Sequence, residues 1–104
     1  MIFAEIEDRG RYEEMHEDLC SLLRSRFAHV ESGLQCDSWI WVHIGPEKVA
    51  VDTFTSIAHQ VKSSCPGKHV EDVIAVLKEQ FSVIVFKEPE WEAHEDSSAD
   101  VEPS

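Results

Sequence analysis

The chain has 104 residues, enough for one domain with one core, and its 42% hydrophobic content indicates a globular fold rather than disorder. Its 21 acidic and 9 basic residues give a net charge of −12. Binding to nucleic-acid phosphates and to anionic membranes depends on cationic side chains, so this charge argues against both kinds of partner. It favours a basic protein as the partner.

The cysteines and the N-terminus predict a cytoplasmic protein. Cys20, Cys36 and Cys65 are an odd set without C-x-x-C spacing, which predicts free thiols in a reducing compartment. The first residues lack the basic and long apolar regions of a signal peptide. No apolar run approaches the roughly 18 residues that a membrane span needs.

The first third of the chain predicts a strand and then a helix. Residues 1–7 alternate, with Ile2, Ala4 and Ile6 on one side. From 11 to 27 apolar residues recur with the period of a helix, at Tyr12, Met15, Leu19, Leu22 and Leu23. Residues 28–37 are irregular, with a short extended piece around His29-Val30.

Residues 38–54 predict a β-hairpin, because two alternating runs of β-branched and aromatic residues flank Gly45-Pro46. An even-length loop with Pro46-Glu47 at its tip keeps one face aliphatic, since successive side chains alternate. This register pairs Ile44 with Val49, Val42 with Val51 and Ile40 with Thr53. The opposite face then carries Trp39, Trp41, His43, Asp52 and Phe54.

The last part of the chain predicts a helix, a strand and a tail. Residues 55–64 either extend the second hairpin strand through a bend or form a separate strand at 57–63, which would make a three-stranded meander. From 68 to 81 a helical stripe runs through Val70, Val73, Ile74, Leu77 and Phe81. Residues 82–87 are apolar on both faces and predict a central strand. Residues 88–104 hold seven acids and no Lys or Arg, which predicts a disordered acidic tail.

These elements predict an α+β domain over residues 1–87, a βαββαβ two-layer sandwich in which a four-stranded antiparallel sheet has two helices on one face. The order resembles the ferredoxin-like, split βαβ arrangement, a topological likeness that implies no activity. The hairpin sequence, Trp-Ile-Trp-Val followed by Lys-Val-Ala-Val-Asp-Thr-Phe, also resembles those of small uncharacterised bacterial domains. That resemblance implies a bacterial cytosolic protein.

The aromatic face of the hairpin is the first candidate site. If the helices cover only the aliphatic face, then Trp39, Trp41, His43, Asp52 and Phe54 form a surface for a protein partner or for self-association. The alternative is that the tail or residues 28–37 cover this face as a second small core. With the acidic run at residues 13–18, the face predicts a non-enzymatic protein-binding domain. A bacterial inhibitor or immunity-type protein for a basic partner is one such domain.

The alternative function is a small enzyme or ligand-binding domain centred on His43, Asp52 and Cys65. His43 and Asp52 are predicted to be diagonal neighbours, close enough for an Asp–His pair. Cys65 precedes Pro66 near a helix start, a position that favours a thiolate. His43, Asp52 and His59 converge only if the second strand bends, and no H-x-x-x-H, C-x-x-C or H-E-x-x-H spacing occurs. We therefore predict no metal site and no cofactor.

Overall fold

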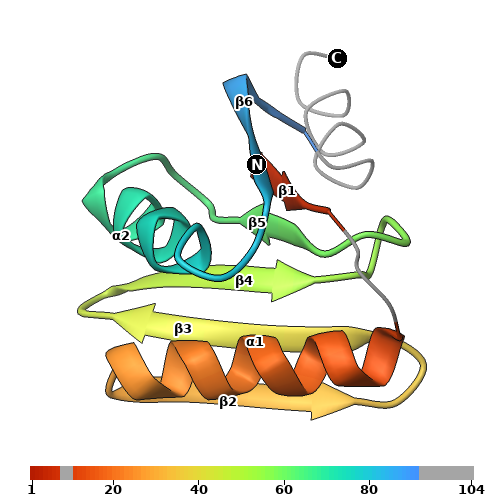
Figure 1. Cartoon of the computed structure of the whole chain (residues 1–104). Helices are drawn as coiled ribbons and strands as arrows, with labels where there is room; N and C mark the ends of the chain where they lie inside the picture. Colours follow the sequence, from red (N-terminus) through yellow and green to blue (C-terminus); the bar gives the residue numbers. More distant parts are fainter. Residues whose placement is uncertain (8–10, 92–104) are drawn as a thin grey trace, which may run out of the picture.

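The computed structural model describes residues 1–7 and 11–91, and these form an α+β fold (Figure 1). None of the described helices is long and apolar enough to cross a membrane. The elements in chain order are β1 (Ile2–Ile6), α1 (Tyr12–Arg26), β2 (His29–Leu34), β3 (Ser38–Ile44), β4 (Glu47–Asp52), β5 (Gln60–Lys62), α2 (Lys68–Leu77) and β6 (Val83–Glu90).

The described strands form one antiparallel sheet in the order β2-β3-β4-β5-β1-β6. The predicted class is confirmed, but the predicted number of four strands is wrong, because the sheet has six strands in the described part of the chain. One addition is β2, which arises where only a short extended piece was expected. The other is β5, so the alternative of a separate strand within 57–63 is correct, but with β2 the described meander has four strands and not three. In Figure 1, β1 and β6 cross the direction of β2, β3 and β4 at a steep angle.

The central hairpin keeps the predicted faces but not the predicted register. Ile44 pairs with Glu47 and Val42 with Val49, so each pair is displaced by two residues from the expectation. A displacement of two leaves every side chain on its own face, because side chains alternate with a period of two. Gly45 has φ of +59° and Pro46 follows it, a combination that suits a tight two-residue hairpin turn.

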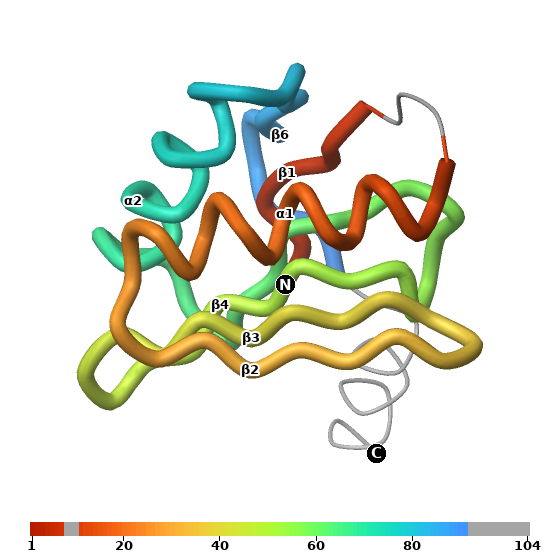
Figure 2. The backbone as a smooth tube through the Cα atoms, turned by 60° about the horizontal axis from the view of Figure 1, so that its bottom comes forward, coloured from red at the N-terminus to blue at the C-terminus, as the bar shows by residue number. Residues whose placement is uncertain are grey.

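Both helices pack on the face of the sheet that carries Ile40, Val42, Val49 and Val51 (Figure 2). These side chains are buried because the predicted helical stripes of α1 and α2 lie directly against them. The observed helices begin within one residue of the predicted starts, and α2 ends four residues earlier than predicted. The shared core comprises Leu19, Leu22 and Leu23 of α1 together with Val70, Val73, Ile74 and Leu77 of α2.

The last strand is an edge strand, not the predicted central strand. In the described part of the chain β6 pairs only with β1, and Ile84 and Val85 on its two faces are 50% and 46% exposed. A short run that is apolar on both faces does not distinguish a central strand from an edge strand. The strand continues to Glu90, into the segment predicted as a tail, and residues 92–104 lie outside the described part.

Candidate functional site

The sheet face opposite the helices carries the aromatic residues that the sequence singled out. We call it the open sheet face and define it by Trp39, Trp41 and His43 of β3 with Lys48 and Ala50 of β4. Alternation places these side chains here because their neighbours in the sequence face the helices. The segment 28–37 does not cover the open sheet face, since β2 extends the sheet beside β3.

Two tryptophans lie in contact on this face. The ring centroids of Trp39 and Trp41 are 4.5 Å apart with the planes inclined by 43°. The ammonium of Lys48 lies 4.2 Å from the Trp41 ring centroid, within the range of a cation–π interaction. Gly33 of β2 lies opposite Trp39, and a Cβ there would come within 2.4 Å of the indole Nε1. The glycine therefore allows Trp39 to lie flat against β2.

A hollow of about 410 Å³ opens on this face beside Trp41. This volume falls within the range of pockets that take a small ligand or a side chain. Phe54, just beyond the end of β4, forms part of the wall and is 50% exposed. The rest of the lining consists of Met1, Lys48, Ala50, Asp52, Thr55, Lys62, Ser63 and Ser64.

Asp52 is fixed by a buried ion pair at the hollow. The Lys62 ammonium lies 2.6 Å from Asp52 Oδ1, and the two side chains are only 6% and 5% exposed. Lys62 also donates to Thr55 Oγ1 at 3.0 Å, and the backbone N–H of Phe54 donates to Asp52 Oδ1 at 3.3 Å. The pair has a structural role, because separating the two groups would leave the Asp52 carboxylate buried without its counter-ion.

His43 does not meet Asp52, so the predicted diagonal pair is wrong. Its Nε2 lies 2.5 Å from Glu31 Oε2 at the β2–β3 side of the sheet. The partner of Asp52 across the hairpin is Trp39, four residues along β3 from His43. At about 3.3 Å per residue this is roughly 13 Å along the strand. The two-residue change in register accounts for the error.

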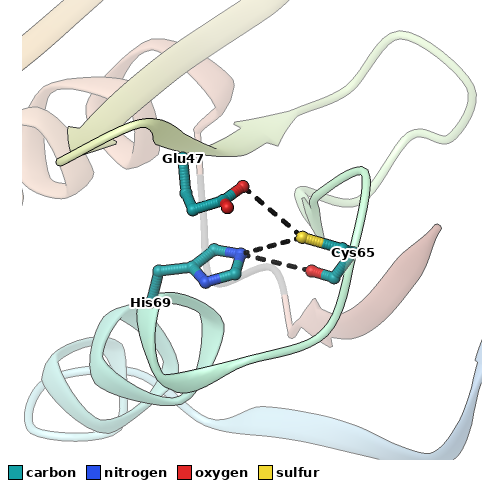
Figure 3. A group of neighbouring side chains, drawn as sticks. All are labelled: Glu47, Cys65 and His69. Atoms are coloured by element: carbon teal, nitrogen blue, oxygen red, sulfur yellow. Dashed lines mark hydrogen bonds between the residues drawn. The ribbon is translucent and has the colours of Figure 1, made fainter.

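Cys65 lies in a third place, beside Glu47 and His69 (Figure 3). Its Sγ is 3.4 Å from Glu47 Oε1 and 3.9 Å from His69 Nε2. The alternative site of His43, Asp52 and Cys65 is therefore not assembled, because each of the three has a different set of neighbours. The signal that sequence reasoning overlooked is the Cys65-x-x-x-His69 spacing, which brings both residues to the start of α2.

A buried polar cluster on the helix-covered face was also missed. The Ser38 hydroxyl lies 2.6 Å from His16 Nδ1 and 2.8 Å from His59 Nε2. His59 is 1% exposed, and its Nδ1 has no hydrogen-bond partner among the described residues. Burial, with a smaller contribution from nearby His16, lowers the pKa of His59 to about 4. His59 does not converge with His43 and Asp52, the arrangement that required a bent strand, because His59 points into the opposite face.

The cluster has further partners on α1. Burial lowers the pKa of His16, whose Nε2 lies 3.4 Å from Cys20 Sγ. The Tyr12 ring stacks on His59 with centroids 6.1 Å apart. Ser38, His16 and His59 are all buried in the described part of the chain, so the hydroxyl and its two imidazoles form a polar part of the core. The i, i+4 spacing of Tyr12, His16 and Cys20 was the available sequence signal.

The three cysteines are free thiols, as predicted. Comparisons of the chain with protein-family models, with curated proteins and with solved structures find no match.

Proposed function

We propose that the chain is a non-enzymatic protein-binding domain and that the open sheet face, with Phe54, is its contact surface. The observation that carries this proposal is the hollow beside Trp41, walled by a half-exposed Phe54. Partly exposed aromatic side chains around a recess are typical of the residues that dominate binding energy in protein interfaces. The separation of His43, Asp52 and Cys65 removes the geometric support for the alternative enzyme.

The chemistry of the surface favours a basic partner that contributes an apolar side chain. The apolar walls at Trp41, Ala50 and Phe54 suit an aliphatic or aromatic side chain of the partner. Four exposed acids on the first half of α1 and the net charge of −12 attract cationic proteins over long range. These acids are Glu13, Glu14, Glu17 and Asp18. An inhibitor or immunity-type protein is the specific role that this combination favours, and a bacterial origin is what the resemblance of the hairpin sequence implies.

The test compares partner capture by matched variants. The wild-type chain is immobilised and exposed to native lysate, and the captured protein is identified by mass spectrometry and purified. Its affinity is then measured by calorimetry for the wild type, Trp41→Ala, Phe54→Ala and Ile57→Ala. Ile57 is the matched control, because it is apolar and 90% exposed but does not line the hollow.

We expect Trp41→Ala to weaken binding by at least about 2 kcal/mol, roughly thirtyfold, and Ile57→Ala to leave it unchanged. A captured protein that binds Trp41→Ala and Phe54→Ala as tightly as the wild type would place the interface elsewhere. A large loss of thermal stability in Trp41→Ala would instead assign Trp41 to packing, so melting curves of all variants are recorded alongside.

Self-association through β6 is a second candidate, favoured by one observation. Among the described strands β6 pairs only with β1, and its Ile84 and Val85 are about half exposed. An edge strand of this kind is a template for pairing with another chain. Sedimentation velocity of the wild type should then show a dimer that Ile84→Lys converts to a monomer. A concentration-independent monomer for the wild type would exclude this candidate.

A further inference from the structure

Three side chains with metal-binding chemistry converge at the start of α2. Glu47 begins β4, Cys65 lies in the turn after β5, and His69 is in the first turn of α2. One donor atom from each lies within 4.8 Å of the other two. Figure 3 shows the carboxylate, the thiol and the imidazole pointing toward one another across the gap between the hairpin and the helix.

The spacing of the donor atoms is close to that of a tetrahedral zinc site. Zinc bonds of about 2.3 Å to sulfur and about 2.0–2.2 Å to nitrogen and oxygen place neighbouring ligand atoms roughly 3.5 Å apart. The observed separations are 3.4 Å from Cys65 Sγ to Glu47 Oε1 and 3.9 Å from Cys65 Sγ to His69 Nε2. The donor atoms of Glu47 and His69 lie within 4.8 Å of each other. Modest side-chain rotations therefore bring the three atoms around one ion.

The charges and the kinds of donor favour a borderline-soft divalent ion. A thiolate and a carboxylate neutralise a dication, and a neutral imidazole completes the set. Glu47 has no ion pair with a cation among the described residues, and the nearest lysines in sequence are engaged elsewhere. Lys48 lies over Trp41 on the open sheet face, and Lys68 pairs with Asp72 at 3.0 Å. Within residues 1–7 and 11–91, no cation therefore pairs with the carboxylate.

The backbone before α2 is built to bring the imidazole close to the turn. Gly67 has φ of +155°, and a Cβ at this position would lie 2.9 Å from Nδ1 and Cε1 of His69. The glycine thus lets the ring fold back over the turn toward Cys65. His69 is 9% exposed, and its Nε2 lies 3.2 Å from the Cys65 carbonyl oxygen and 3.1 Å from Ser63 Oγ. These contacts hold Nε2 on the side where Glu47 and Cys65 lie.

We propose that Glu47, Cys65 and His69 form a binding site for one zinc-class divalent ion, with the fourth tetrahedral position taken by water. On binding, the Cys65 thiol loses its proton to solvent and sulfur becomes a thiolate ligand. His69 takes the tautomer protonated at Nδ1 and gives up the hydrogen bond that Nε2–H donates to the Cys65 carbonyl, so that Nε2 supplies its lone pair to the ion. Three protein ligands with one open position are the arrangement of zinc sites that keep room for water or substrate. The site stands independently of partner binding at the open sheet face.

The test uses the tag-free, reduced and metal-stripped full chain titrated with Co²⁺ as a spectroscopic substitute for Zn²⁺. We expect saturation at one ion per chain, a thiolate-to-cobalt charge-transfer absorption, and displacement of cobalt by Zn²⁺. Cys65→Ser should abolish the charge-transfer absorption. His69→Gln and Glu47→Gln should each weaken binding by at least about 100-fold, because loss of an outer partner alone typically costs 10- to 100-fold. Binding of each ion should release about one proton from the thiol into weakly buffered solution.

The matched control is Cys36→Ser, which removes an exposed thiol remote from the site in sequence and should leave the cobalt spectrum unchanged. Far-UV circular dichroism of every variant separates loss of binding from loss of the fold, and Cys65→Ser is nearly isosteric. Retention of the charge-transfer absorption in Cys65→Ser would overturn the proposal. So would its loss in Cys36→Ser, or the absence of saturable cobalt binding by the folded wild type at concentrations up to about 1 mM.

Discussion

The buried imidazole of His59 makes the fold sensitive to acid over a defined range. Its pKa is about 4 in the folded chain, against 6.5 for an ordinary histidine. As the pH falls below 6.5, His59 becomes protonated in the unfolded chain but stays neutral in the folded chain. The free energy of unfolding therefore decreases. The decrease continues until about pH 4, below which both states are protonated. Each tenfold change in proton affinity is worth about 1.4 kcal/mol, so the loss is about 3 kcal/mol.

The cause of this effect is local and can be removed by one substitution. His59 is buried beneath Tyr12 beside His16. Among the described residues no acceptor lies within hydrogen-bond distance of its Nδ1, so a proton added there would have no partner. The free energy of unfolding is measured by urea titration of tryptophan fluorescence at intervals from pH 7.5 to 4, for the wild type and for His59→Gln. The variant is expected to be less stable at pH 7.5, because it loses ring packing, but to lose about 3 kcal/mol less than the wild type on acidification.

The difference between the two pH profiles reports His59 together with its coupling to His16, since the other titrating groups contribute to both profiles. If the profiles run parallel between pH 6.5 and 4, the reasoning is refuted, because His59 would then titrate alike in the folded and unfolded chains. A gain in stability of the wild type on acidification would refute it in the opposite sense.

Three further outcomes follow from packing. Asp52→Ala should destabilise the chain by about 3–5 kcal/mol in urea unfolding, because the buried Lys62 ammonium loses the Asp52 carboxylate. Adding Lys62→Met should restore most of the loss, and no recovery in the double variant would contradict the ion-pair account. Gly33→Ala should displace the ring of Trp39 and alter near-UV circular dichroism, and an unchanged spectrum would show that the ring does not lie where a Cβ would reach it. Leu23→Ala should cost about 2–5 kcal/mol in thermal unfolding, and a cost below about 1 kcal/mol would mean that Leu23 is not core.

The periodicity of hydrophobic residues predicted the elements that depend on contacts between residues close in sequence. The helical stripes around Leu19 and Val73 located α1 and α2, because the period of a helix is a local property that burial of one face imposes on the chain. The alternation around Val42 and Val49 assigned the hairpin faces correctly for the same reason. The error of two residues in register went undetected because it leaves that alternation unchanged.

Long-range contacts were decided only by the tertiary structure. Whether the run at Val83–Glu90 is central or at the edge depends on which strands come to lie beside β1, and no local period records that. The same holds for Glu47, which the fold brings to Cys65 across 18 positions of the chain. The sequence alone determined that Trp39 and Trp41 share a face away from the aliphatic core. The fold then separated His43, Asp52 and Cys65, because the strand register and the packing of the elements, rather than the chemistry of the side chains, decide which side chains are in contact.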